Sequence, residues 1–121
     1  MTDPPTGDHL VAVLSALANP IRLRILATLT GGRDYVSHLA REIGVSRPLL
    51  HMHLQRLEAV GLVVGTLELS SDGKAMKFFE VADFALTLTP ATLTQAAATL
   101  TAADPSAPPS AAPRPAPKEP T

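Results

Sequence analysis

The 121-residue chain contains no cysteine, which excludes disulfides, thiolate nucleophiles and thiolate metal ligands together and gives no sign of an oxidising compartment. Aromatic residues make up only 3% of the chain while hydrophobic residues make up 45%, so we expect one domain with an aliphatic core. No apolar run approaches the length of a membrane span, and the first residues, MTDPPTGDH, lack a signal-peptide pattern. We therefore expect a cytoplasmic protein that contacts no membrane.

Charge is scarce but unevenly distributed. The formal net charge of −1 argues against a protein that coats nucleic acid indiscriminately. Positive charge is nevertheless concentrated in the middle of the chain. Between residues 20 and 60 there are arginines at positions 22, 24, 33, 41, 47 and 56, against the acids Asp34, Glu42 and Glu58.

The C-terminal segment differs in composition from the rest. Seven of the seventeen residues from Pro105 to Thr121 are proline, and most of the others are alanine or serine. Such a segment buries too little apolar surface to offset its ordering entropy. We expect residues 104–121 to form a disordered, solubilising tail, residues 1–7 to be a flexible N-terminus, and residues 8–103 to form the folded domain.

Helical signals dominate the first half of the domain. Residues 8–18 are apolar on more than one side, and Asn19-Pro20 is a cap-then-proline signal that opens a second helix over 20–29. A short helix is predicted over 36–43, where Gly44 stops it. A fourth helix is predicted over 46–60, with Ser46 as its N-cap and Gly61 after its end.

The second half begins with strands. Residues 62–70 and 75–81 are β-type runs separated by the turn cluster 70–74, which contains Asp72-Gly73 and predicts a hairpin. Residues 84–89 alternate and are interpreted as an optional third strand. Thr89-Pro90 opens a final helix over 90–103. The predicted order is α-α-α-α-β-β-(β)-α, a mainly α fold with a β-hairpin (α+β).

The fourth helix has two distinct sides. Leu50, Leu54 and Leu57 share one side, which we expect to face the core. Guanidinium and amide groups on the opposite side suit base edges and phosphates. That outward side carries Arg47, Pro48, His51, Met52, Gln55 and Arg56.

Together, helix 36–43, the turn 44–46 and helix 46–60 predict a helix-turn-helix whose second helix reads DNA in the major groove. The hairpin within 62–82 is then a wing, with Lys74 and Lys77 at or near its tip for phosphate contacts. We therefore predict a winged helix-turn-helix protein that binds double-stranded DNA sequence-specifically and regulates transcription.

Two segments, ALANPIRLRILATL at 16–29 and VSHLAREIGVSRPLLHMHLQRLEAVGLV at 36–63, followed by a wing, resemble the ArsR/SmtB family of small dimeric bacterial repressors. The resemblance covers roughly residues 8–100. It implies a homodimer with paired terminal helices that reads an inverted repeat. The family's DNA-facing positions correspond to Ser46, Arg47, Leu49, His51, Met52 and Gln55. The family often has Thr, Ser and His where this chain has Leu49, His51 and Met52, so the operator sequence does not carry over; Leu49 and Met52 are hypothesised to contact thymine methyl groups.

The terminal helices also favour a dimer on their own pattern. The first is apolar nearly all round, and the last has an uncharged apolar stripe, so an isolated domain would leave apolar surface exposed. The alternative is that both helices complete the core of a single monomer. The predicted interface comprises Leu10, Val13, Leu14, Leu17, Leu93, Ala96, Ala97 and Leu100.

The four histidines raise the question of a metal site. His51 and His53 diverge by about 200° on one helix, so they cannot chelate one ion; His53 is instead expected to be packed and hydrogen-bonded. His9 with Asp8 is a weak candidate for nickel or zinc, shared between subunits. The chain also resembles a nickel-responsive regulator of superoxide dismutase genes. Because the chain has no obvious metal site, that resemblance suggests that a separate partner protein senses the metal.

Catalysis is not predicted, because no catalytic spacing or phosphate-binding glycine loop stands out. An alternative function stays open beside DNA reading. The winged helix could be a protein-interaction module whose DNA activity depends on a metal- or ligand-sensing partner.

Overall fold

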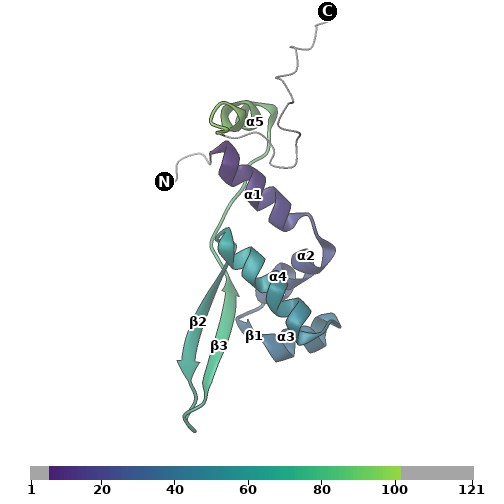
Figure 1. The fold of residues 1–121 in the computed structure, drawn as a ribbon, viewed down its shortest axis with the longest axis vertical. Coiled ribbons are helices and arrows are strands. Elements are labelled where there is room, and N and C mark those ends of the chain that lie inside the picture. The colour runs from purple at the N-terminus through teal and green to yellow at the C-terminus, as the bar shows by residue number, and fades with distance from the viewer. Residues whose placement is uncertain (1–5, 102–121) are drawn as a thin grey trace, which may run out of the picture.

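The computed structural model describes residues 6–101 (Figure 1). Its helices are α1 (Gly7–Leu17), α2 (Pro20–Leu29), α3 (Val36–Ile43), α4 (Arg47–Ala59) and α5 (Pro90–Ala97). Its strands are β1 (Asp34–Tyr35), β2 (Val63–Leu69) and β3 (Ala75–Val81), which form an antiparallel sheet in the order β1-β3-β2. The predicted winged helix-turn-helix fold is confirmed, although the observed order has a strand, β1, between α2 and α3.

Helix starts follow the predicted caps. Asn19 Oδ1 accepts the backbone N–H groups of Ile21 and Arg22 at 2.8 and 3.3 Å, which satisfies donors left free by the first turn of α2. The side chain of Thr89 caps α5 in the same way, accepting from the backbone N–H of Thr92 at 3.1 Å. Each cap precedes a proline, so the local sequence fixes where these helices begin.

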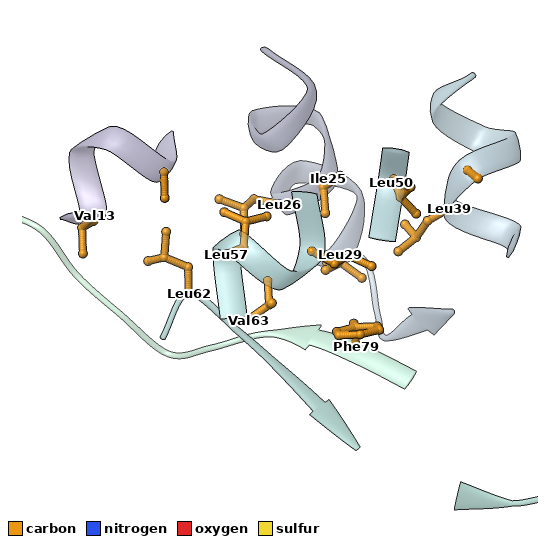
Figure 2. Close-up of a cluster of buried hydrophobic side chains, with 13 residues drawn as sticks. Val13, Ile25, Leu26, Leu29, Leu39, Leu50, Leu57, Leu62, Val63 and Phe79 are labelled. Atoms are coloured by element: carbon orange, nitrogen blue, oxygen red, sulfur yellow. The ribbon is translucent and has the colours of Figure 1, made fainter. Parts of the chain in front are cut away.

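The core lies between the helices and one face of the sheet (Figure 2). Phe79 projects from β3 and is 1% exposed, and β3 is the central strand, flanked by β1 and β2. The helices contribute aliphatic side chains, as the composition predicted. The cluster includes Val13, Ile25, Leu26, Leu29, Leu39, Leu50, Leu54, Leu57, Leu62 and Val63.

The interpretation of residues 84–89 as a third strand is wrong. These residues form no strand and carry the chain from the sheet to α5 (Figure 1). Both edges of β3 are already occupied, because β2 pairs along one side and β1 along the other, with Asp34 opposite Phe79. The third strand is therefore β1, whose two residues are too few to produce a sequence pattern.

The terminal helices also differ from their predicted bounds. The α1 helix begins at Gly7 because the Thr6 side chain accepts from the backbone N–H of His9 at 3.1 Å, so residues 6 and 7 are not loose. The α5 helix ends at Ala97, not at residue 103. Thr99 Oγ1 donates to the carbonyl of Ala96 at 3.0 Å and accepts from the backbone N–H of Gly7 at 2.7 Å, and these bonds replace a further helical turn. Residues 1–5 and the predicted tail 104–121 lie outside the described residues.

None of the helices within residues 6–101 is by itself long and apolar enough to cross a membrane. Helices α1 and α2 reach such a length only as a pair bent by 91°.

Candidate nucleic-acid interface

The turn between α3 and α4 depends on Gly44. Its φ of 87° lies in the left-handed region that favours glycine, and its backbone N–H donates to the carbonyl of Ala40 at 2.8 Å. Two residues later, Ser46 Oγ accepts the backbone N–H of Leu49 at 3.2 Å and starts α4. These two ends set the angle between α3 and α4, which is the geometry of a helix-turn-helix.

Helix α4 has the two sides that its sequence predicts. Leu50, Leu54 and Leu57 are each 0% exposed and form the inward side. Met52 is half-buried, so only part of its side chain is accessible. Exposed residues at the predicted DNA-facing positions are Ser46, Arg47, Pro48, Leu49, His51, Gln55 and Arg56. The structure therefore leaves a largely cationic and polar side of α4 accessible, while contact with DNA itself stays a prediction.

His53 is packed and hydrogen-bonded, as expected. It is 4% exposed, and its Nδ1 accepts from Arg22 Nε of α2 at 3.0 Å. Burial lowers the pKa of the imidazole, and the neighbouring positive charges of Arg22 and Arg56 lower it further. Sequence reasoning did not identify Arg22 as the partner, because the two residues are 31 positions apart.

An open groove lies between the first half of α4, the start of α3 and strand β3. Its volume is about 390 Å³, and Arg47 and His51 line one side. The remaining lining residues are Tyr35, Val36, Ser37, Met76, Lys77 and Phe79. The groove therefore joins the outward side of α4 to the hairpin.

The two predicted wing lysines differ in their surroundings. Lys74 is exposed in the turn that connects β2 and β3. Lys77 lies on β3 rather than at the tip, where its Nζ is 3.7 Å from Glu58 Oε1 and 5.2 Å from the centroid of the Phe79 ring. The charge of Lys77 is therefore shared with a carboxylate, so we expect Lys74 to be the better phosphate contact.

A further cation lies beside the hairpin. The Arg33 guanidinium forms a forked pair with Glu68 of β2 and lies 4.5 Å from the centroid of the Phe78 ring. This guanidinium holds the pKa of Glu68 below its usual range. The hairpin is thus tied to the loop that precedes β1, and Arg33 is occupied within the chain.

Candidate metal ligands do not converge within residues 6–101, where no group of three or more His, Asp or Glu side chains is placed to hold an ion. Asp8 accepts from the backbone N–H of Thr101 at 3.2 Å, while His9 is exposed. His38 has Asp34 2.5 Å from its Nδ1 and Glu42 3.7 Å from its Nε2, so these carboxylates face opposite ring nitrogens.

The residues predicted for a dimer interface divide into two groups. Leu10, Val13 and Ala96 are 6%, 5% and 5% exposed, so they are buried within the chain itself. Leu93 and Leu100 are each 48% exposed and Ala97 is exposed, whereas Leu14 and Leu17 are half-buried. Val11, which was not predicted, is 57% exposed on α1. The α1–α5 region therefore keeps apolar surface that a second chain could cover.

Comparison with known proteins agrees with this geometry. A family described as a helix-turn-helix domain matches residues 17–66. The chain is 36% identical over 69 residues to an uncharacterised HTH-type transcriptional regulator of Methanocaldococcus jannaschii, an alignment covering 57% of this chain and 72% of the relative. It is 45% identical over 53 residues to the HTH-type transcriptional regulator CmtR of Mycobacterium tuberculosis. That alignment covers 44% of this chain and only 45% of CmtR.

A solved structure extends the comparison to the fold. It is the solution NMR structure of a homodimeric winged helix-turn-helix DNA-binding domain from Mycobacterium bovis, described as a possible ArsR-family transcriptional regulator. The TM-score is 0.56 with 30% sequence identity, and the match covers 63% of this chain and 66% of that one. The ArsR resemblance seen in residues 16–63 is thus also present in three dimensions.

Proposed function

Because this chain belongs to the HTH-type transcriptional regulators, we propose that it binds operator DNA as a homodimer with α4 in the major groove. The observation that carries the proposal is the division of α4. Its leucines are fully buried, while Arg47, Gln55 and Arg56 remain exposed on the other side. Such a helix presents bidentate donors and acceptors that suit base edges.

The groove beside α4 provides a path for the DNA backbone. Arg47 lines it from α4, and the hairpin forms its other wall. A strand that leaves the major groove at α4 would cross this groove, and Lys74 at the hairpin turn would meet a phosphate beyond it. Phosphate contacts of this kind fix the register of the helix, whereas α4 supplies the sequence information.

Two observations support a homodimer. The similar Mycobacterium bovis domain is described as homodimeric. In this chain, the exposed apolar residues Val11, Leu93 and Leu100 belong to α1, to α5 and to the segment after it. Figure 1 places α5 and the hairpin tip at opposite ends of the molecule, so self-association through α1 and α5 would leave α4 and the hairpin accessible.

Selection of bound DNA from a random pool tests the proposed function, followed by a salt titration on the selected sequence. We expect one enriched inverted repeat and a linear fall of log affinity with log salt concentration, because bound phosphates release counterions. Absence of both sequence preference and salt dependence would instead favour the alternative, a module that binds another protein.

Metal response is a separate part of the proposal. We place nickel or zinc sensing, as implied by the resemblance to a nickel-responsive regulator, in a partner protein, and keep His9 with Asp8 as the weak site within this chain. Repeating the selection with nickel and with zinc, using this chain alone, separates the two. A metal-dependent change in affinity without any other protein would place sensing within the chain. We also propose that the chain acts by binding, without catalysis.

Arg47→Ala is expected to weaken binding to the selected sequence by about 1–3 kcal/mol, because it removes a guanidinium at the start of α4. Fluorescence anisotropy measures the change in Kd, which would be roughly 5- to 150-fold. Arg24→Ala removes an arginine that is also exposed, from α2, and is the matched control. Equal losses in both variants would indicate general electrostatics and contradict the docking of α4.

Leu93→Glu is expected to shift the protein from dimer to monomer, because it places a charge in the exposed apolar surface of α5. Sedimentation velocity across a concentration series measures the shift. The control is Leu69→Glu, since Leu69 is 75% exposed on the hairpin at the other end of the molecule. A wild-type protein that is monomeric throughout the series would contradict the homodimer.

A further inference from the structure

Arg22 of α2 joins three helices through one side chain. Its Nε donates to His53 Nδ1 of α4 at 3.0 Å, and its Nη1 donates to the carbonyl oxygen of Ala16 of α1 at 3.3 Å. Ala16 lies in the last turn of α1, where carbonyl groups have lost their helical partners. The guanidinium therefore satisfies the end of α1 and holds α4 at the same time.

His53 is the only buried polar side chain among residues 6–101. It occupies the middle of α4 beside Leu54, so its imidazole is part of the surface by which α4 packs on the domain. Because Nδ1 accepts from an arginine, which can only donate, the ring must be neutral with its proton on Nε2. A second proton on Nδ1 would replace this hydrogen bond with two positive groups in contact.

We propose that Arg22 is a positioning residue for DNA binding, holding α4 against α1 and α2 through neutral His53, and that protonation of His53 releases α4 and weakens operator binding. The inference rests on the proposed function, because it assumes that α4 reads DNA. It adds a proton-sensitive link between the end of α1 and the DNA-facing helix.

The charged groups around His53 support this direction. Arg22 from α2 and Arg56 from α4 both place positive charge near the ring, and burial lowers its pKa most strongly. The ionisable groups of the other elements that pack on α4 are paired, lie at the far end of α1, or are exposed, as Arg24 of α2 and Arg41 of α3 are. Asp8 and His9 are at the opposite end of α1 from Ala16, Glu68 of β2 pairs with Arg33, His38 of α3 lies between Asp34 and Glu42, and Glu58 of α4 pairs with Lys77.

The sign of the pH dependence follows from linkage. A histidine in an unfolded chain has a pKa of about 6.5, and the pKa of His53 is lower than this in the folded protein. The packed state of α4 therefore binds fewer protons than a state in which α4 is released. Its stabilising contribution is complete above the pKa of the released state and is lost as the pH falls toward the folded pKa.

The test compares wild type with His53→Asn, in which the amide oxygen can accept from Arg22 but does not titrate. Operator affinity is measured by anisotropy from pH 8.0 to 5.0 at constant ionic strength. The two proteins share every other ionisable group, including His51, so their difference isolates His53. We expect wild type to lose up to about tenfold more affinity per pH unit for each subunit of the dimer, the limit for one linked proton per chain. Superimposable profiles would overturn the proposal.

A second variant tests the other partner. Arg22→Met should weaken binding at pH 8.0, where His53 is neutral, and should also make the pH profile less steep, because one of the two repelling charges is gone while burial and Arg56 remain. A merely structural role for Arg22 would weaken binding without changing the shape of the profile. Circular dichroism is the control measurement, and we expect it to show the same helix content in both variants as in wild type. An Arg22→Met profile as steep as that of wild type would contradict the link.

Two measurements without DNA separate this inference from the proposed function. Nitrogen chemical shifts of His53 should show a neutral ring with an unprotonated Nδ1 at pH 7.5. Amide exchange in α4, corrected for its intrinsic pH dependence, should accelerate as the pH falls below the ordinary histidine pKa of about 6.5 in wild type and not in His53→Asn. If wild type binds no DNA at pH 8.0, the proposed function fails while these readouts still decide the link. A protonated Nδ1 at pH 7.5, or equal exchange in both proteins, would overturn it.

Discussion

Phe79→Ala is expected to lower the free energy of unfolding by about 3–5 kcal/mol, the cost of removing a large aromatic side chain from a packed core. Phe79 is 1% exposed and lies on the central strand, where it meets the aliphatic residues of the helices (Figure 2). Truncation leaves a cavity between the sheet and the helices, which the surrounding side chains fill only in part. Urea denaturation followed by circular dichroism measures the change.

Phe84→Ala provides the matched control for this substitution. Phe84 is 43% exposed in the segment between β3 and α5, so its removal takes away far less buried area. A loss below about 1 kcal/mol is therefore expected. Comparable losses in the two variants would mean that the sheet does not pack on the helices as the structure shows.

Gly7→Ala is expected to separate α5 from α1. A Cβ atom at Gly7 would lie 2.2 Å from the carbonyl oxygen of Ala96 and 2.7 Å from Leu100 Cγ. The first contact is with backbone, which cannot move aside as a side chain would. Overpacking typically costs about 1–3 kcal/mol and occasionally more. The hydrogen bond from the Gly7 N–H to Thr99 would be lost with it, so both stability and self-association should fall.

The control for Gly7→Ala is Gly31→Ala. The new Cβ at Gly31 would be 3.5 Å from the carbonyl oxygen of Thr28, an ordinary contact, and the backbone there is not in the left-handed region. Both substitutions restrict the unfolded chain to a similar degree. Denaturation and sedimentation velocity should therefore show a loss for Gly7→Ala alone. A Gly7→Ala protein that behaves like the control would contradict the close packing of α1 on α5.

Local chemistry explains what the sequence predicted well. The starts of α2, α4 and α5 can be predicted from a few neighbouring residues. Each has an N-cap side chain whose oxygen accepts a backbone N–H of the first turn, namely Asn19, Ser46 and Thr89. Gly44 marks the end of α3 in the same way. The division of α4 into a leucine side and a polar side follows from helical period alone, and so do the predicted DNA contacts on that polar side. Ser46 and Leu49 were predicted from the family resemblance instead.

Contacts between distant residues explain what the sequence did not predict. Strand β1 exists only because Asp34 and Tyr35 lie beside β3, and the end of α5 depends on Gly7, more than 90 positions earlier. The acceptor role of His53 toward Arg22 is equally non-local, although its burial could be inferred from its place beside the leucines. The pattern of apolar residues in the sequence likewise does not predict which residues of α1 and α5 are buried against each other and which stay exposed.

The arrangement along the long axis has a consequence for how such a protein can change. Helices α4 and α5 lie apart along the long axis in Figure 1, so the proposed sequence preference and subunit pairing can diverge separately over generations. Arg22 is an exception, since it touches α1, α2 and α4 at once. A variant at that position would disturb the packing of α1, α2 and α4 together, so we expect substitutions there to be tolerated less often than those on the exposed side of α4.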